Sequence, residues 1–191
     1  MSDAEISDAE LLKAFSEGNA CSLNKLIQRY KQPIFSWLLG MTGNHADAED
    51  IYQDVWVRVI RHADRFHDHS FRAWLWQITR NLLIDFRRKR KADVSLDATV
   101  EDGATPLVDL LTDKGKNPAQ TLEQTEMLQT VMRAVLALPE LQREVFLMRV
   151  QGELSFSEIA LTLKIPLNTA LGRMHDAMEK LKKIVAAEPG L

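Results

Sequence analysis

Cysteine is nearly absent from this sequence: Cys21 is the only one among 191 residues. A chain with one cysteine can form neither an internal disulfide nor a zinc site built from several cysteines, which fits a reducing compartment. No run approaches eighteen apolar residues, so we expect no insertion into a membrane. The first ten residues are acidic and polar and do not resemble a signal peptide. The sequence therefore indicates a cytoplasmic protein.

Glycine is also scarce, and the 8 glycines are too scattered to form a loop that cradles a phosphate. Asp47, Asp50 and Asp54 share one helical face, but no histidine or further acid obviously completes a metal shell. We therefore expect no metal and no cofactor.

The run His67–Ser70 contains residue types that hydrolases use. Four consecutive loop residues do not by themselves supply a base, its orienting partner and a nucleophile in a defined geometry. A small hydrolase centred on this run is the least favoured interpretation, and we expect no catalytic residue.

The net charge of −3 conceals an uneven distribution. Residues 71–91 carry seven lysines and arginines against one aspartate, whereas 1–70 and 92–130 are acidic. Cations attract phosphates through counterion release, and aromatic faces stack on unpaired bases. With Trp76 expected on the exposed side and Trp74 in the core, the basic segment is predicted to contact single-stranded or partly melted DNA. The alternative is a solvated helix end whose cations complement the helix dipole.

Apolar residues recur at helical spacing along most of the chain. Helices are expected over residues 8–39 with a break at Gly18–Asn19, over 47–61, 71–91, 122–138 and 139–150, and a further break is expected from Gly40 to Asn44. The apolar face of the helix 71–91 is expected to comprise Phe71, Trp74, Leu75, Ile78, Leu82 and Phe86.

Helical periodicity disappears between Ala92 and about Pro118, where Asp, Thr and Ala are common. Without a continuous apolar stripe this stretch cannot form a core. The sequence therefore predicts an all-α fold with two small helical domains, 1–91 and 121–191, joined by a flexible acidic linker, 92–120.

The C-terminal domain contains a helix-turn-helix pattern. Ser155 and Glu158 have capping-box spacing, the run Lys164–Pro166 breaks the helix, and a second helix is expected from Asn168 to about Val185. This layout is typical of DNA-binding domains, although a helical hairpin is also a permitted packing in any all-helical protein.

Four segments together resemble a known family. Asp47–Arg58 and Phe71–Arg88 are similar to the promoter-opening half of extracytoplasmic-function sigma factors, which direct bacterial RNA polymerase to promoters. Leu138–Phe146 and Leu154–Ala160 are similar to the second half of these proteins, including its helix-turn-helix. The segments occur in the family's order and spacing across nearly the whole chain.

The resemblance implies two macromolecular partners, bacterial core RNA polymerase and promoter DNA, and a separate anti-sigma factor as a further partner. It implies a face for the clamp helices of the polymerase, comprising Asp50, Gln53, Asp54 and Arg58. It implies contacts to the melted downstream promoter element by His67, Asp68, His69, Ser70, Trp76, Arg80, Asn81, Arg87, Arg88, Lys89 and Arg90. It implies contacts to the upstream element, as duplex, by Ser155, Asn168, Thr169, Leu171, Gly172, Arg173 and His175.

The predicted recognition helix departs from the family pattern. Lys164 stands where the family usually has glycine, and Leu171 and Asp176 stand where cations are common. Each lost phosphate contact lowers the log-log salt dependence of binding by about one unit. We therefore expect weak or unusual upstream recognition.

An autonomous helix-turn-helix regulator that binds duplex DNA, alone or as a dimer, is the alternative function. The sequence shows no evident ligand pocket and no dimerisation heptad, which disfavours this interpretation.

Overall fold

The computed structural model describes residues 6–66, 70–94 and 130–187. In these ranges regular structure is entirely helical, which confirms the predicted all-α fold. The elements are α1 (Asp8–Ser16), α2 (Ala20–Thr42), α3 (His45–His62), the 3₁₀ turn η1 (Ala63–Arg65), α4 (Phe71–Val94), α6 (Glu140–Val150), α7 (Phe156–Leu163) and α8 (Leu167–Ala187). Residues 130–136 are also helical. The predicted linker 92–120 begins inside α4 and otherwise lies outside the described residues.

Helix α2 ends inside the break that the sequence predicts from Gly40 to Asn44, but it continues past Gly40 to Thr42. A Cβ added at Gly40 would lie 2.7 Å from Cδ1 of Leu147, so this glycine provides room for a side chain of α6. The helix is capped at Gly43, whose φ of 69° is left-handed and whose N–H donates to the carbonyl of Leu39 at 2.8 Å. Glycine is favoured there because it adopts this conformation without steric cost.

Several helices begin at residues whose side chains cap the first turn. Ser7 and Glu10 form a capping box at α1, and Ser155 and Glu158 form the predicted one at α7. Asn44 accepts a hydrogen bond from the backbone N–H of Asp47 and caps α3. These caps satisfy backbone donors that the first turn leaves free.

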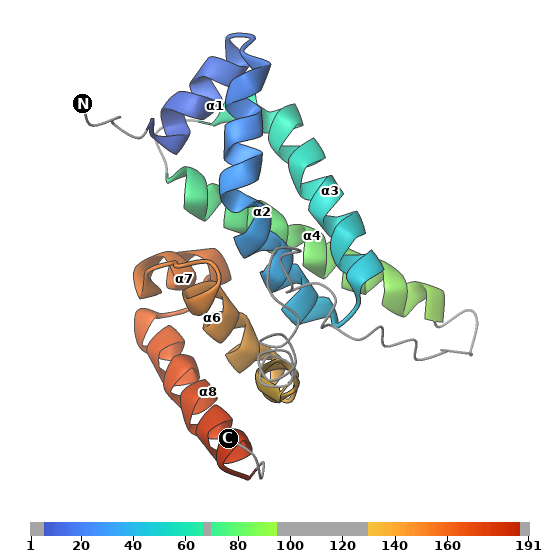
Figure 1. Ribbon diagram of the computed structural model, residues 1–191, viewed down its shortest axis with the longest axis vertical. Helices are drawn as coiled ribbons and strands as arrows, with labels where there is room; N and C mark the ends of the chain where they lie inside the picture. Colours follow the sequence, from blue (N-terminus) through green and yellow to red (C-terminus); the bar gives the residue numbers. More distant parts are fainter. Residues whose placement is uncertain (1–5, 67–69, 95–129, 188–191) are drawn as a thin grey trace, which may run out of the picture.

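The helices α1 to α4 form the N-terminal module, the described residues 6–94 (Figure 1). Helix α2 packs on α1 and α3, and α3 packs on α4. Trp37 of α2 lies at the centre, fully buried, with Trp76 of α4 edge-on to it at a centroid distance of 5.5 Å. Edge-to-face packing of this kind adds to the stabilisation that burial provides.

The buried side of α4 differs from the prediction. Phe71 and Leu75 are buried as expected, but Trp76 and Leu83 are buried as well, while Trp74 is only partly buried. The reason is that α2, α3 and α7 all pack against α4, so its buried band is wider than one amphipathic stripe.

The helices α6, α7 and α8 belong to the C-terminal module, the described residues 130–187. Helix α8 packs on both α6 and α7. Lys164 ends α7 in the left-handed conformation, with φ at 54°, and turns the chain into α8. The module thus contains the predicted helix-turn-helix.

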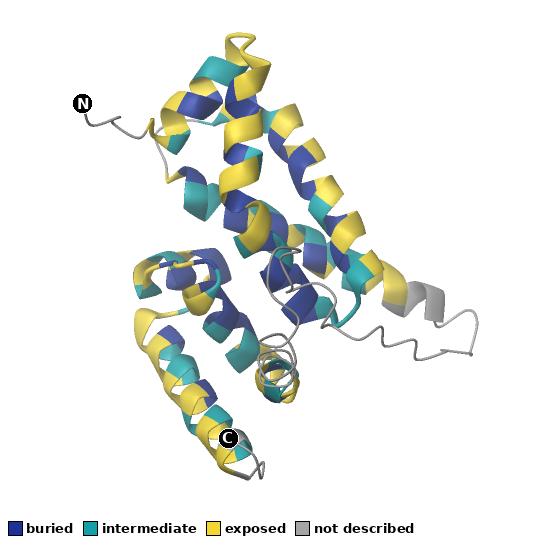
Figure 2. Ribbon diagram, in the orientation of Figure 1, coloured by how far each residue is buried: buried dark blue, intermediate teal, exposed yellow. Residues whose placement is uncertain are grey.

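The two modules share one core. A single cluster of buried side chains extends from Leu12 and Trp37 in the N-terminal module to Leu147, Leu154 and Ile159 in the C-terminal module. Figure 2 shows this buried region continuing where α6 and α7 lie against the N-terminal helices. In the described arrangement the two modules therefore form one packed body.

Candidate nucleic-acid interface

The basic side of α4 is occupied by acidic groups of the C-terminal module. Arg80 donates from Nε to Oε1 of Glu144 at 2.8 Å. Arg87 forms an ion pair with Glu140 and also donates from Nη2 to the backbone carbonyl of Met41 at 2.7 Å. Two of the cations predicted to contact DNA are therefore already paired within the chain.

Glu144 is buried, with 6% of its surface exposed. Burial raises the pKa of its carboxyl above the usual value, and the adjacent Arg80 guanidinium opposes this rise. The ion pair thus offsets the cost of desolvating the carboxylate only in part.

The last turns of α4 present the more accessible cations. Arg88 is exposed and pairs with Asp85 at 3.2 Å one turn earlier, and Lys89 is also exposed. Arg90 forms an ion pair with Asp47 at the start of α3. These residues provide a basic surface at the end of the helix.

Trp76 cannot stack on a base in this arrangement, which corrects the sequence-based expectation for this residue. Its side chain is fully buried between Trp37 and Gly152, where an added glycine Cβ would lie 2.6 Å from Cζ2 of Trp76. Trp74 packs against the core as expected, with its ring near those of Phe66 and Phe71, but it is only partly buried and also lines an open cavity.

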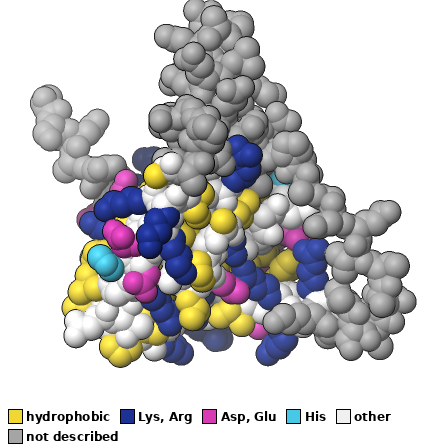
Figure 3. Space-filling model, turned by 90° about the horizontal axis from the view of Figure 1, so that it is seen from below, with side chains coloured by type: hydrophobic (Ala, Val, Ile, Leu, Met, Phe, Trp, Pro, Cys, Tyr) yellow, Lys and Arg dark blue, Asp and Glu magenta, His cyan; other side chains and the backbone are white. Residues whose placement is uncertain are grey.

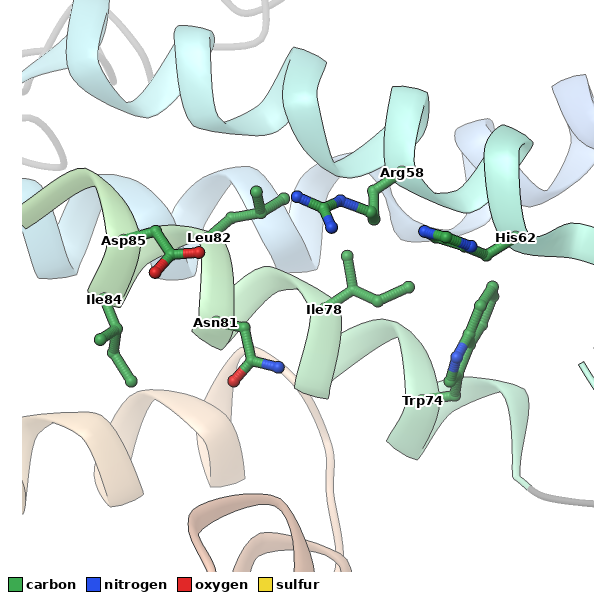
Figure 4. A pocket seen from close by; sticks show the side chains of 8 residues that line it. All are labelled: Arg58, His62, Trp74, Ile78, Asn81, Leu82, Ile84 and Asp85. Carbon is green, nitrogen blue, oxygen red and sulfur yellow. The ribbon is translucent and has the colours of Figure 1, made fainter. Parts of the chain in front are cut away.

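This cavity lies between α3 and α4 and has a volume of about 380 Å³ (Figure 4). Arg58 and His62 extend into it from α3, and Trp74 and Asn81 line it from α4. Its full lining comprises Arg58, His62, Trp74, Ile78, Asn81, Leu82, Ile84 and Asp85. An indole face, an amide and a guanidinium around one hollow are chemically suited to a flat heteroaromatic ligand such as a nucleobase.

The predicted polymerase-binding residues share the outer face of α3. Asp50, Gln53, Asp54 and Arg58 are all exposed there. The apolar Val57 and Ile60 of the same helix are 43% and 47% exposed. This mixture of charged and apolar groups is typical of a surface that binds protein.

Of the loop residues that are predicted to contact DNA, the structure describes Ser70. His67, Asp68 and His69 lie outside the described residues. Ser70 is exposed and accepts a hydrogen bond from the backbone N–H of Ala73, which caps α4, and its hydroxyl lies 3.5 Å from Oε1 of Glu158.

The predicted upstream contacts lie on or beside α8. Asn168, Leu171, Gly172 and His175 are exposed and recur at helical spacing, so they share one face of α8. Thr169 and Arg173 are partly buried, and Ser155 is exposed at the start of α7.

The exposed face of the helix-turn-helix is more apolar than basic. Leu161, Leu167 and Leu171 are 71%, 45% and 42% exposed. Figure 3 views the molecule from below, where basic, acidic and apolar side chains intermingle on the surface. The geometry thus agrees with the scarcity of cations noted in the sequence.

Among the residues described, no group of three or more His, Cys, Asp or Glu side chains could hold a metal ion. In the same part of the chain, no helix is both long and apolar enough to cross a bilayer.

Sequence reasoning missed the carboxylates that pair with α4. Glu140 and Glu144 are one turn apart on α6, and their partners Arg80 and Arg87 are two turns apart on α4. Charged residues spaced by one or two turns are too common on helices to identify a contact between distant segments.

Two segments of the chain match known protein families. Residues 26–92 match Sigma-70 region 2, and residues 128–181 match Sigma-70, region 4. The fold and these two matches define a helical transcription-initiation protein of the sigma-70 type.

The sequences of similar proteins identify the family to which the chain belongs. The chain is 33% identical over 175 residues to the ECF RNA polymerase sigma factor SigW of Bacillus subtilis (strain 168), covering 90% of this chain and 93% of the relative. It is 29% identical over 166 residues to the ECF RNA polymerase sigma factor SigE of Mycolicibacterium smegmatis, covering 86% of this chain and 62% of that relative. The chain belongs to the extracytoplasmic-function (ECF) family of RNA polymerase sigma factors.

Two solved structures share the fold. The sigma factor RpoE of Bartonella quintana, in complex with the anti-sigma factor NepR, has a TM-score of 0.68 at 20% identity, covering 86% of this chain and 97% of that chain. CnrH, in complex with the cytosolic domain of CnrY, has a TM-score of 0.65 at 23% identity, covering 95% of this chain and 98% of that chain.

Proposed function

We propose that this sigma factor divides promoter recognition between two domains. Residues 1–91 bind core RNA polymerase and the melted downstream element, residues 121–191 bind the upstream element as duplex, and residues 92–120 connect them. The observation that carries this proposal is the cavity between α3 and α4, which lies beside the cations at the end of α4.

The cavity is the proposed site for an unpaired base of the non-template strand. The partly buried Trp74 offers a face for stacking, and the exposed Asn81 offers an amide that can both donate and accept. Arg88 and Lys89 are exposed and are proposed to contact the flanking phosphates. Binding energy from these contacts offsets the cost of unstacking the base.

The exposed face of α3 is the proposed contact to the clamp helices of the polymerase. Asp50, Gln53, Asp54 and Arg58 supply polar contacts, and the exposed Val57 supplies apolar area beside them. Arg58 belongs both to this face of α3 and to the lining of the cavity. The surfaces proposed to bind polymerase and to bind the unpaired base therefore adjoin.

Helix α8 is the proposed reader of the upstream element. Its exposed face holds Asn168, Leu171, Gly172 and His175, and Arg173 adds one cation. With so few cations, phosphate contacts contribute little, and upstream binding is expected to be weak and only slightly salt-dependent.

The protein is proposed to catalyse no covalent reaction and to act in the cytoplasm, where polymerase and promoter are found. It is also proposed to have an anti-sigma partner, because RpoE, which shares its fold, is bound to the anti-sigma factor NepR in its structure.

The decisive experiment is transcription by sigma-free bacterial core polymerase on a library of random templates, with and without this protein. The expected result is a set of discrete start sites that share two spaced upstream motifs. A protein that gave no start sites and did not bind core polymerase, yet shifted duplex DNA alone, would instead be an autonomous regulator.

Two substitutions with matched controls test the sites. Asn81→Ala is expected to weaken binding to the melted strand, whereas Gln77→Ala, an exposed amide one turn away on α4 and outside the cavity, is not. Asp54→Ala is expected to weaken binding to core polymerase, with Glu49→Ala, an exposed carboxylate on the same helix, as control.

A further inference from the structure

The exposed side of the first turns of α8 combines apolar side chains with an amide. Leu167 and Leu171 are exposed and lie one turn apart, and Asn168 is exposed beside them. Figure 2 shows exposed residues along α8 at the edge of the molecule. In a helix-turn-helix, the first turns of the second helix are the part that reaches base edges in the major groove.

The charge around these leucines favours DNA as their partner. Residues 164–175 contain two cations, Lys164 and Arg173, and no carboxylate. Lys164 is exposed and ends α7 in the turn that leads into α8. Phosphates are attracted to such a segment, which favours a duplex over an apolar protein surface.

A leucine is suited to one feature of the major groove. Thymine alone among the four bases presents a methyl group there, whereas the other bases present hydrogen-bond donors and acceptors. A leucine packed on a polar base edge would leave such a group without a partner, which costs free energy. Asn168 favours adenine, the partner of thymine, because an amide pairs with N6 and N7 of that base. Leu171 and Asn168 therefore both favour A·T pairs.

Gly172 provides an independent indication of a close approach. It follows Leu171 on the exposed face, and nothing lies within 4 Å of a Cβ added there. Its φ is not in the left-handed region, so neither packing nor backbone conformation requires a glycine. Glycine inside a helix lowers stability relative to alanine. A glycine with this cost is expected where another molecule comes close to the backbone.

We propose that Leu171 selects thymine in the upstream element by packing on its methyl group in the major groove. Gly172 lets the backbone of α8 come close enough for this contact. The inference rests on the proposed function, since it requires α8 to read the upstream element. Burial of one methyl group corresponds to about fourfold in binding, so this contact supplies affinity and specificity that do not depend on phosphates.

Uracil tests the contact because it differs from thymine only by the absence of the methyl group. The full-length protein and core polymerase transcribe a template chosen from the random library, at a concentration that gives half-maximal yield. Each thymine of its upstream motif is replaced by uracil in turn. At one position the wild-type yield is expected to fall by about threefold or more. Leu171→Ala is expected to give a lower yield with thymine and no further loss with uracil.

Met178→Ala is the matched control. Met178 is 40% exposed and Leu171 is 42% exposed, but Met178 lies two turns further along α8. This variant is expected to keep the full response to uracil. 5-Methylcytosine paired with guanine at the same position supplies the methyl group on another base. It is expected to give more transcript than cytosine with wild type and the same amount with Leu171→Ala.

Leu171→Lys exchanges the apolar contact for a phosphate contact. It is expected to abolish the response to uracil and to steepen the log-log salt dependence of promoter binding by about one unit. A uracil response that persisted in Leu171→Lys would contradict the proposed contact.

Gly172→Ala tests the close approach. It is expected to lower the yield by about fivefold or more, because the added methyl group would meet the DNA. A lower yield from a more stable helix cannot be caused by unfolding. An unchanged yield would show that α8 does not approach the DNA as proposed.

The outcomes separate this inference from the proposed function. An upstream motif without A·T pairs, or equal uracil responses in wild type and Leu171→Ala, overturns the thymine contact and leaves the division of promoter recognition standing. Start sites that share no upstream motif contradict the proposed role of α8 itself. If Leu171→Ala weakened binding to core polymerase without DNA, the leucines would be a protein contact, and the inference would be wrong.

Discussion

Arg80 and Glu144 join α4 to α6 through a hydrogen bond of 2.8 Å between residues that are 64 apart in the sequence. The carboxylate is buried, whereas the Arg80 side chain is 23% exposed. Because desolvation opposes the attraction, such a pair adds little net stability, and its main effect is to fix how α6 lies on α4.

Glu144→Gln is expected to change how stability depends on pH. The pKa of Glu144 is raised above its usual value of 4.5, so its contribution to stability is fully present below that value and is lost as pH rises through the raised pKa. Glutamine does not titrate, so the variant should gain stability relative to wild type between pH 4.5 and neutrality. Urea unfolding across this range measures the difference.

Glu10→Gln is the control, because this substitution should change the pH dependence of stability in the opposite direction. Hydrogen bonds from Ser7 lower the pKa of Glu10, so its contribution is present above the usual value and is lost as pH falls. Parallel pH profiles for wild type and Glu144→Gln would contradict the assigned burial of the Glu144 carboxyl.

Gly152→Ala is expected to destabilise the protein by about 1–3 kcal/mol through overpacking. The new methyl group would lie 2.6 Å from both the carbonyl oxygen of Met148 and Cζ2 of Trp76. Gly172→Ala is the control, because nothing lies within 4 Å of an added Cβ in this exposed part of α8. It should stabilise the helix by about 0.5–1 kcal/mol. Chemical unfolding of both variants checks the contrast.

The tryptophans are expected to respond differently to single-stranded DNA. Trp74 lines the cavity, so its fluorescence should be quenched when a base stacks on it, and Trp74→Phe should abolish most of that change. Trp76 is fully buried against Trp37, so Trp76→Phe should lower stability while the quenching persists. Quenching that depended on Trp76 instead would show that DNA reaches the interior of the interface.

Ser155→Ala is expected to lower the stability of the helix-turn-helix by about 1 kcal/mol, the usual value of an N-cap. The Ser155 hydroxyl accepts from the backbone N–H of Glu158, and the Glu158 carboxylate accepts from the backbone N–H of Ser155. Ser157→Ala, at an exposed position of the same turn, should have little effect. Hydrogen exchange in the first turn of α7 locates the change.

Local signals in the sequence predicted most helices and the helix-turn-helix. The capping box at Ser155 and the break at Lys164 depend on residues within one or two turns, and both are found where expected. The helix α8 begins at Leu167, one residue before the predicted start. Such features are predictable because their interactions are short-range.

Long-range packing could not be predicted in the same way. Gly40 opens the predicted break of Gly40 to Asn44, but it lies within α2, where its lack of a side chain accommodates Leu147, which is distant in the sequence. The expected exposure of Trp76 is wrong because α4 is covered by α7 as well as by α3, and Trp74, although it packs against the core, stays partly open to solvent. A single helical stripe cannot reveal a second packing partner.

Arg87 reaches two acceptors at once, the carboxylate of Glu140 and the carbonyl of Met41 at the end of α2. Only the first belongs to the C-terminal module. The Met41 carbonyl holds the Arg87 guanidinium independently of Glu140, so the rotamer of this side chain does not depend on a bound anion. Arg87 therefore loses little side-chain entropy when it binds an anion. A freely rotating lysine at this position would lose more.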